Sequence, residues 1–155
     1  MPTSSLLHVL AQQAIGRGQG LLHRVTGGDF PPFSCVAAVV ERDGELLLLD
    51  RSDGQGLCLP GGYVRMGEEP AKAMVREVLE ETGYRVEVTA LLAALPDATS
   101  RIKSVNIVYA CEVVDGELRA SHEGRPLWAA PDAFKDRLLP VSRLTLERLG
   151  HLPVP

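Results

Sequence analysis

The hydrophobic pattern of the chain changes from helix-like spacing near the N-terminus to strand-like runs after residue 33. Apolar runs of strand length are bounded by turn residues, as half-buried and buried strands usually are. Asp43-Gly44 separates the first two runs and is a strong hairpin signal. Asp115-Gly116 is a second such signal, placed before residues 117–121. The runs that predict strands cover residues 34–41, 45–51, 84–95 and 102–114.

Helical spacing interrupts these strands in the middle of the chain. Residues 70–82 are predicted to form a helix, because Pro70 suits the first helical position and Gly83 suits the position after the end. Shorter helices are predicted after Pro131 and over residues 141–149. Strands that alternate with helices, together with hairpins inside the sheet, indicate a mixed α/β sandwich.

Residues 1–29 differ from the rest and are predicted to form a short N-terminal helical arm, with Pro31 and Pro32 at its junction. Glycines in the stretch 16–20 weaken this helix, since each costs up to about 1 kcal/mol in a helix interior. We expect the arm to pack on the domain or on a second subunit. Its apolar positions are Leu6, Leu7, Leu10 and Ala14.

Composition and charge exclude several classes of protein. The 155 residues suit one domain, and a net charge of −4 argues against long nucleic acid as a partner. The chain has no CxxC motif and three cysteines, an odd number that does not suit a set of disulfide pairs. This favours a reducing, cytoplasmic location. No apolar run approaches the about 20 residues of a membrane helix, and the start lacks the features of a signal peptide.

The helix over residues 70–82 carries three carboxylates, Glu77, Glu80 and Glu81, which share one face at 100° per residue. A neighbouring stripe of Ala71, Val75, Val78 and Thr82 is predicted to face the core. A solvated acidic face is the ordinary interpretation of such glutamates. Crowded like charges repel, however, and a hard divalent cation would relieve them. The upstream Gly61-Gly62 turn allows a backbone carbonyl or a ligand to approach closely.

These residues resemble the Nudix box. Gly62, five residues, Glu68, seven residues and then REVLEETGY from Arg76 to Tyr84 match the family pattern at every fixed polar and glycine position. Tyr84 replaces the usual aliphatic residue, and Arg65 stands where many members carry Glu. The similarity covers about residues 33–140. It implies a Nudix-type α/β/α sandwich with a mixed β-sheet over residues 30–155.

The resemblance also implies hydrolysis of a nucleoside diphosphate linked to a group X, with Mg²⁺ or Mn²⁺ as cofactor. The implied metal ligands are Glu77, Glu80, Glu81 and the carbonyl of Gly61. Arg76 is expected to orient the carboxylates, and Glu68 to support the metal site; Glu77 and Glu81 are also implied in catalysis.

The sequence alone does not identify the general base. Glu77 or Glu81 could activate the water, and so could a carboxylate beyond the box, with Glu123 as first candidate and Glu112 as second. A solvated loop position is an equal alternative for Glu123.

Substrate recognition is less specified by the sequence. Arg51, Arg65 and Glu123 are candidate substrate-binding residues, with Arg101 and Lys103 as further cations near strand ends. The proline and tyrosine markers of ADP-ribose and dinucleoside polyphosphate enzymes are missing at residues 100–102. The remaining candidates for the substrate are a nucleoside triphosphate or another nucleoside diphosphate derivative. The single Trp128 could stack on a base, although a lone Trp more often packs in a core.

Three rival interpretations stay open at the level of sequence. A nucleotide-binding module without catalysis is the main alternative, but such modules usually have a broken box. An isomerase resembling the isopentenyl diphosphate enzymes would need a longer chain. The third makes the N-terminal arm a partner-binding or dimerising element, and a homodimer is the corresponding prediction.

Overall fold

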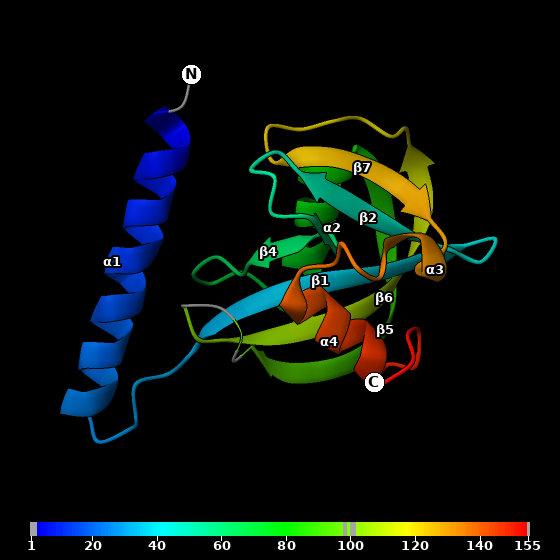
Figure 1. Cartoon of the computed structure of the whole chain (residues 1–155). Coiled ribbons are helices and arrows are strands. Elements are labelled where there is room, and N and C mark those ends of the chain that lie inside the picture. Colours follow the sequence, from blue (N-terminus) through cyan, green and yellow to red (C-terminus); the bar gives the residue numbers. More distant parts are fainter. Residues whose placement is uncertain (1–2, 98, 100–101, 155) are drawn as a thin grey trace.

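The computed structural model describes residues 3–97, 99 and 102–154. A mixed sheet forms its centre, with helices on both faces (Figure 1). The strands run in the order β3-β2-β1-β6-β5, while β4 pairs with β1 and β7 with β2. Among the strand pairs of the described residues, only β1 and β6 are parallel. The elements are α1 (Thr3–Val25), β1 (Phe33–Arg42), β2 (Glu45–Arg51), β3 (Leu57–Cys58), β4 (Gly61–Tyr63), α2 (Pro70–Thr82), β5 (Tyr84–Asp97), β6 (Ser104–Gly116), β7 (Gly124–Ala129), α3 (Pro131–Phe134) and α4 (Pro140–Arg148).

Two apolar clusters hold helices on opposite faces of the sheet, which confirms the predicted sandwich. Leu47 packs with Met74 and Val78 of α2 on one face. Leu48 packs with Phe134 and Leu146, from α3 and α4, on the other. Strand β2 is buried on both faces, and this explains why its sequence is an unbroken run of leucines rather than an alternating pattern.

The first predicted hairpin is confirmed. Strands β1 and β2 are antiparallel, with Glu41 opposite Leu46. Asp43 and Gly44 between them both have positive φ, at 53° and 80°. These values fit the two-residue turn for which Asp-Gly is favoured.

The second predicted hairpin, at Asp115-Gly116, is wrong. Strand β6 ends there, but β1 and β5 already occupy its two edges, so the next segment cannot fold back onto it. The backbone N–H of Arg119 instead donates to the carbonyl of Thr82 at the end of α2 (2.8 Å). The chain then crosses to β2 as β7, a strand that the sequence pattern did not predict.

The predicted N-terminal helical arm is confirmed as a helix, but it is longer than the short element expected. Helix α1 runs for 23 residues, through Gly16, Gly18 and Gly20. Figure 1 shows it beside the body, and Gln19 in its middle is only 7% exposed. The side chain of Gln19 bonds to the body: its amide donates to the carbonyl of Lys103 (2.7 Å) and accepts from its N–H (2.8 Å). No helix in the described part of the chain is long and apolar enough to cross a membrane.

Gly20 is exposed on α1, so the effect of replacing it should come from helix propensity. Replacing Gly20 by Ala meets open space and no strained φ. We expect a gain of about 1 kcal/mol, and hence about fivefold slower amide hydrogen exchange within α1. The melting temperature of the body should stay the same. Equal exchange rates in α1 of the two proteins would contradict this.

Candidate active site

The turn between β4 and α2 brings the two buried glutamates of α2 against a glycine backbone. The N–H of Gly61 donates to Oε2 of Glu81 (2.8 Å), so the backbone at Gly61 turns away from its partner strand β1 and toward α2. A Cβ at Gly61 would lie 2.1 Å from the carbonyl oxygen of Val36. Glycine is therefore required for β4 to lie this close to β1.

Gly62 provides the space for the second glutamate. A Cβ at this position would lie 2.6 Å from the carboxyl carbon of Glu77 and 2.7 Å from each of its oxygens. The missing side chain of Gly62 is thus what lets the Glu77 carboxylate lie against strand β4.

Arg76 fixes the approach to these carboxylates. Its Nε and Nη2 donate to the two oxygens of Glu68 (both 2.8 Å), and Nη1 donates to Glu77 (2.6 Å). Nη2 also donates to the carbonyl of Tyr63 (3.2 Å). The guanidinium lowers the pKa of Glu68 to about 2. The planar guanidinium of Arg76 therefore links the segment just before α2, the middle of α2 and strand β4 through hydrogen bonds.

Burial sets the electrostatics of Glu77 and Glu81. Both lie in the middle of the buried face of α2, with Glu81 only 3% exposed, so they do not form the separate carboxylate side that the pattern predicted. Burial raises the pKa of Glu81 to about 8. The hydrogen bond from the N–H of Gly61 acts in the opposite direction and lowers this pKa, but its effect is smaller. Burial also raises the pKa of Glu77, although Arg76 opposes the shift. Two desolvated carboxylates side by side are costly without a cation.

This donor set fits a divalent cation. Mg²⁺ in proteins is usually held by one or two carboxylates and keeps several waters. Glu77 and Glu81 supply the carboxylates. The carbonyl of Gly61 points to the same side of β4 as its N–H, because Gly61 stands in a strand position whose groups face away from β1.

Comparison with known proteins agrees with this geometry. The model of the NUDIX domain matches residues 31–149. The chain belongs to the Nudix family. It is 37% identical to a MutT-like protein of Streptomyces ambofaciens over 120 residues, 75% of this chain and 77% of that one. It is 36% identical to an ADP-ribose pyrophosphatase of Methanocaldococcus jannaschii over 99 residues, 61% of this chain and 59% of that one.

The solved structure of a UDP-X diphosphatase has the same fold, with a TM-score of 0.68 at 24% identity. The match covers 95% of this chain and 75% of that one. As a Nudix protein with an intact box, this chain is a pyrophosphohydrolase that acts on phosphoanhydrides, a class whose members generally depend on divalent metal.

Glu80 lies differently from the other two glutamates of the Nudix helix. Its side chain is 50% exposed and pairs with Arg65 (3.4 Å) and Arg76 (3.5 Å). No group of three or more His, Cys, Asp or Glu residues is arranged to hold a metal among the described residues. To become a ligand, Glu80 would have to leave these arginines, so its predicted role stays a prediction.

The pairing of β7 with β2 brings Glu123 to the Nudix site. Glu123 precedes β7, and its carbonyl accepts from the N–H of Ser52 just after β2 (2.8 Å). Burial is the largest cause that raises the pKa of Glu77 and of Glu81, and the negative charge of Glu123 is a smaller cause that raises both. Glu112 differs: its neighbour Cys111 faces α2, so strand alternation turns Glu112 to the opposite face.

Two arginines of the predicted substrate site lie near these carboxylates. Arg51 donates to Asp53 through Nε (3.1 Å) and Nη2 (2.6 Å), and its charge acts to lower the pKa of Glu81. Arg65 is mostly exposed and reaches Glu80. Sequence reasoning missed Asp53, whose carboxylate orients Arg51, because no motif marks it.

The remaining candidates take other roles or lie elsewhere. Trp128 packs beside the α2-facing core, with Nε1 donating to Tyr84 (3.4 Å) and Arg42 over its ring, so it does not stand ready for a base. The backbone of Lys103 holds Gln19. Arg101 lies outside the described residues.

Replacing Arg76 by Lys should show that this arginine positions the carboxylates. Lysine keeps the charge but loses the fork to Glu68 and the bond to Glu77. We expect kcat to fall about 10- to 100-fold, with a higher Mg²⁺ concentration at half-maximal rate. Arg143→Lys, on the exposed pair with Glu147, is the matched control. An unchanged metal requirement in R76K would argue against the positioning role.

Proposed function

We propose that this protein hydrolyses a nucleoside diphosphate linked to X, of the nucleoside triphosphate or nucleotide-sugar type, with Mg²⁺ or Mn²⁺ bound at Glu77, Glu81 and the carbonyl of Gly61. One observation carries the metal site: two buried carboxylates lie against the glycines of strand β4, one bonded to the N–H of Gly61 and the other to the guanidinium of Arg76. Glu80 is proposed as a further ligand at the exposed rim.

A bound divalent cation would supply charge neutralisation for the diphosphate oxygens and a more acidic water. The protein groups do the rest. Arg76 fixes Glu77, and Glu68 fixes Arg76, so the carboxylates are in place before substrate binds. Glu123 is the carboxylate outside the helix whose charge reaches Glu77 and Glu81, and we assign to it the proton of the attacking water.

Arg51 and Arg65 are proposed to contact substrate phosphates. Arg51 is the better placed, since it is partly buried near Glu81 and held by Asp53. Arg65 stands at the exposed rim beside Glu80. An arginine matches the geometry of a phosphate through paired N–H donors.

The relatives point to phosphoanhydride substrates of more than one kind. Their names include a MutT-like protein and an ADP-ribose pyrophosphatase. The missing proline marker at residues 100–102 favours a triphosphate or nucleotide sugar over ADP-ribose. A cytoplasmic location and a homodimer stay predictions from the sequence, as does the exclusion of long nucleic acid.

A substrate panel tests the proposal. Nucleoside triphosphates, nucleotide sugars, dinucleoside polyphosphates and ADP-ribose are incubated with Mg²⁺ or Mn²⁺, and products are separated to show which phosphorus is attacked. We expect metal-dependent release from the first two groups and loss of turnover in EDTA. Tight nucleotide binding with no product from any substrate would favour the binding module instead.

A further inference from the structure

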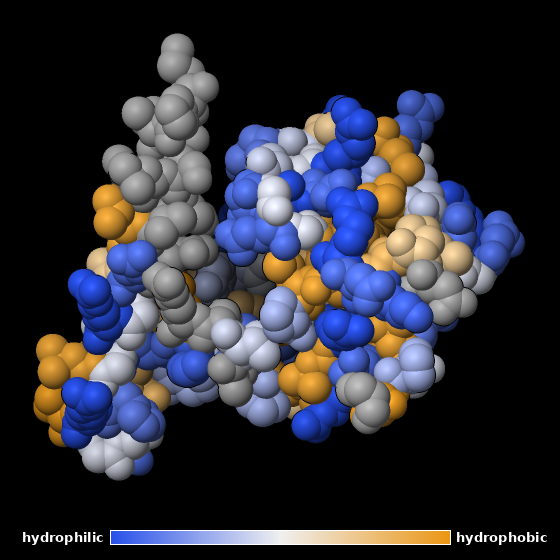
Figure 2. Space-filling model, viewed as in Figure 1, coloured by the Kyte–Doolittle hydropathy of each residue, from blue (hydrophilic) through white to orange (hydrophobic). Residues whose placement is uncertain are grey.

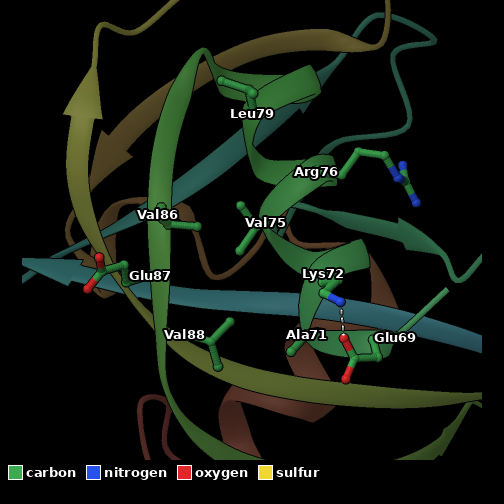
Figure 3. A pocket seen from close by; sticks show the side chains of 9 residues that line it. All are labelled: Glu69, Ala71, Lys72, Val75, Arg76, Leu79, Val86, Glu87 and Val88. Carbon is green, nitrogen blue, oxygen red and sulfur yellow. Dashed lines mark ion pairs between the residues drawn. The ribbon is translucent and has the colours of Figure 1, made fainter.

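The apolar groove between α2 and β5 offers little for recognising a nucleoside (Figure 3). Its volume is about 660 Å³ and its walls are mainly aliphatic. Of its charged members, Lys72 pairs with Glu69. Figure 3 shows the carboxylate of Glu87 and the guanidinium of Arg76 turned away from the hollow. Since recognition of a base uses hydrogen bonds to its edge, this groove does not suit the nucleoside part of a substrate.

Polar and aromatic side chains gather elsewhere, at the start of strands β1 and β6. Cys35 of β1 stands opposite Tyr63 of β4 and Asn106 of β6. Because alternate residues of a strand share a face, these three lie on the sheet face of Ala37 and Val108, opposite α2. We call this set the Asn106 cluster; its members are Phe33, Cys35, Tyr63, Asp97, Ser104 and Asn106.

The amide of Asn106 is available to a ligand. This residue is only 8% exposed. Within the part of the chain that the structure describes, no residue forms a hydrogen bond with its side chain, yet neither polar atom is fully shielded from solvent. A mostly buried amide without a partner is unfavourable, because it has lost most of its hydration. One donor group and one acceptor therefore face whatever enters the cluster from solvent.

Two aromatic rings complete the cluster. Phe33 precedes Cys35 by two residues and so shares its face of the sheet. The rings of Phe33 and Tyr63 meet edge to face, with centroids 6.0 Å apart. Both stay well exposed, at 39% and 47%. Proteins commonly hold a base by stacking it on aromatic side chains while polar groups bond to its edge.

The charges that act on the cluster are negative and favour a neutral ligand. Burial is the largest cause that raises the pKa of Cys35 and of Tyr63, and the negative charge of Asp97 raises both further. The charge of Glu77 also acts on Cys35, so the cluster lies close to the buried glutamates of α2. Like charges repel, and a phosphate is therefore disfavoured here, whereas a neutral base is not.

Strand β4 links the cluster to those glutamates. The N–H of Gly61 bonds to Glu81. Gly62 lies against the carboxylate of Glu77. From Gly61 to Tyr63 the strand rises about 7 Å. Because β4 carries no side chain before Tyr63, a ribose can pass over it between a diphosphate at the glutamates and a base in the cluster.

Helix α1 stands beside this end of the sheet (Figure 1). The carbonyl of Lys103, next to Ser104 of the cluster, accepts from the amide of Gln19 (2.7 Å) and from the N–H of Phe33 (3.1 Å). The helix and the starts of β1 and β6 therefore meet at one carbonyl group. Figure 2 shows the surface hollowed between α1 and the body, which leaves room for a ligand there.

We propose that Asn106 recognises the nucleobase of the substrate, its amide donating to and accepting from one edge of the base while Phe33 and Tyr63 hold the face of the ring. This inference rests on the proposed function, which places the diphosphate at Glu77 and Glu81. A carboxamide pairs with a base edge that has a donor next to an acceptor. Asn106 is thus a specificity-determining residue outside the Nudix box.

Equilibrium binding measured by titration calorimetry tests this without turnover. The probes are methylene-bridged triphosphates of adenosine, guanosine, cytidine and uridine, together with the same triphosphate without a nucleoside, all with Mg²⁺. We expect Asn106→Leu to weaken the best-bound nucleotide about 10- to 100-fold and to leave the nucleoside-free probe unchanged. Thr89→Val, which removes an exposed hydroxyl bonded to the carbonyl of Ala110 on β6, is the control and should keep all affinities.

Asn106→Asp gives a result that a purely structural role would not produce. The carboxylate has nearly the same size but only accepts, so it favours guanine, whose Watson–Crick edge has two adjacent N–H donors, over adenine, which has one. The ratio of guanosine to adenosine affinity should rise about tenfold. This ratio also decides the role of Asn106 if the leucine variant does not fold.

Three results would overturn the role of Asn106: an unchanged ratio in N106D, an equal loss of the nucleoside-free probe in N106L, or a wild type that binds this probe as tightly as the nucleotides. Failure of the proposed function is a separate result. A wild type that hydrolyses nothing in the substrate panel, but shows these binding differences, would refute the hydrolysis and support the recognition of the base by Asn106.

Discussion

Replacing Glu81 by Gln is expected to lower kcat by about 10² or more while the fold is kept, because it removes a ligand charge that acts on the transition state. The amide is nearly the same size, and its oxygen can still accept from the N–H of Gly61. Steady-state kinetics at saturating Mg²⁺ measure the effect. Glu77→Gln should behave similarly, since Glu77 is the other buried carboxylate of the box.

The exposed Glu117, which follows β6, supplies the matched control, and Glu117→Gln should keep wild-type turnover. Circular dichroism spectra of all three variants should agree with the wild type. Near-wild-type turnover in both E81Q and E77Q would refute the assignment of the metal ligands.

The same substitution changes how stability depends on pH in EDTA. The folded pKa of Glu81 is raised to about 8 from an ordinary 4.5, so the folded state holds this proton more tightly than the unfolded state does. The resulting stabilisation is complete below the unfolded pKa and is lost as the pH rises through 8. We expect the wild type to lose stability over that interval and E81Q to lose less. Thermal melts at a series of pH values measure the difference.

Replacing Gly62 by Ala is expected to lower kcat by about 10², because small misplacements of reacting groups cost this much. The new methyl would lie 2.6 Å from the carboxyl carbon of Glu77, and the carboxylate would have to move. It is the far end of a flexible side chain, so the free energy of unfolding should change little. Gly62 has no positive φ, and the backbone accepts alanine.

Gly61→Ala gives the opposite result and serves as the comparison. Its methyl would meet the backbone carbonyl of Val36 at 2.1 Å, which cannot move without disturbing β1. We expect a loss of about 1–3 kcal/mol in unfolding free energy, as for other overpacked sites. Gly20→Ala on α1 controls for a Gly-to-Ala change in open space and should keep kcat. Full activity of G62A with an unmoved melting temperature would show that the position of Glu77 is not critical.

Local sequence was enough for the elements whose signals are local. Pro70 begins α2, and Gly83 ends it in a left-handed conformation with its N–H bonded to the carbonyl of Leu79. The Asp43-Gly44 turn also follows from local φ preferences. The second Asp-Gly pair failed because hairpin formation needs a free strand edge, and strand order decides whether one exists.

For the site, the sequence by itself determined the family and the box, because the fixed spacing of the box along one helix and the glycines before it is a local property. It could not show that Glu77 and Glu81 are buried while Glu80 is exposed, since burial depends on what covers each flank of α2. Only the tertiary structure brought Glu123 to these glutamates, through the pairing of β7 with β2 across more than seventy residues. The length of α1 was likewise not visible in the sequence: helix propensity favoured a short element, whereas the contacts of Gln19 with Lys103 join residues 84 positions apart.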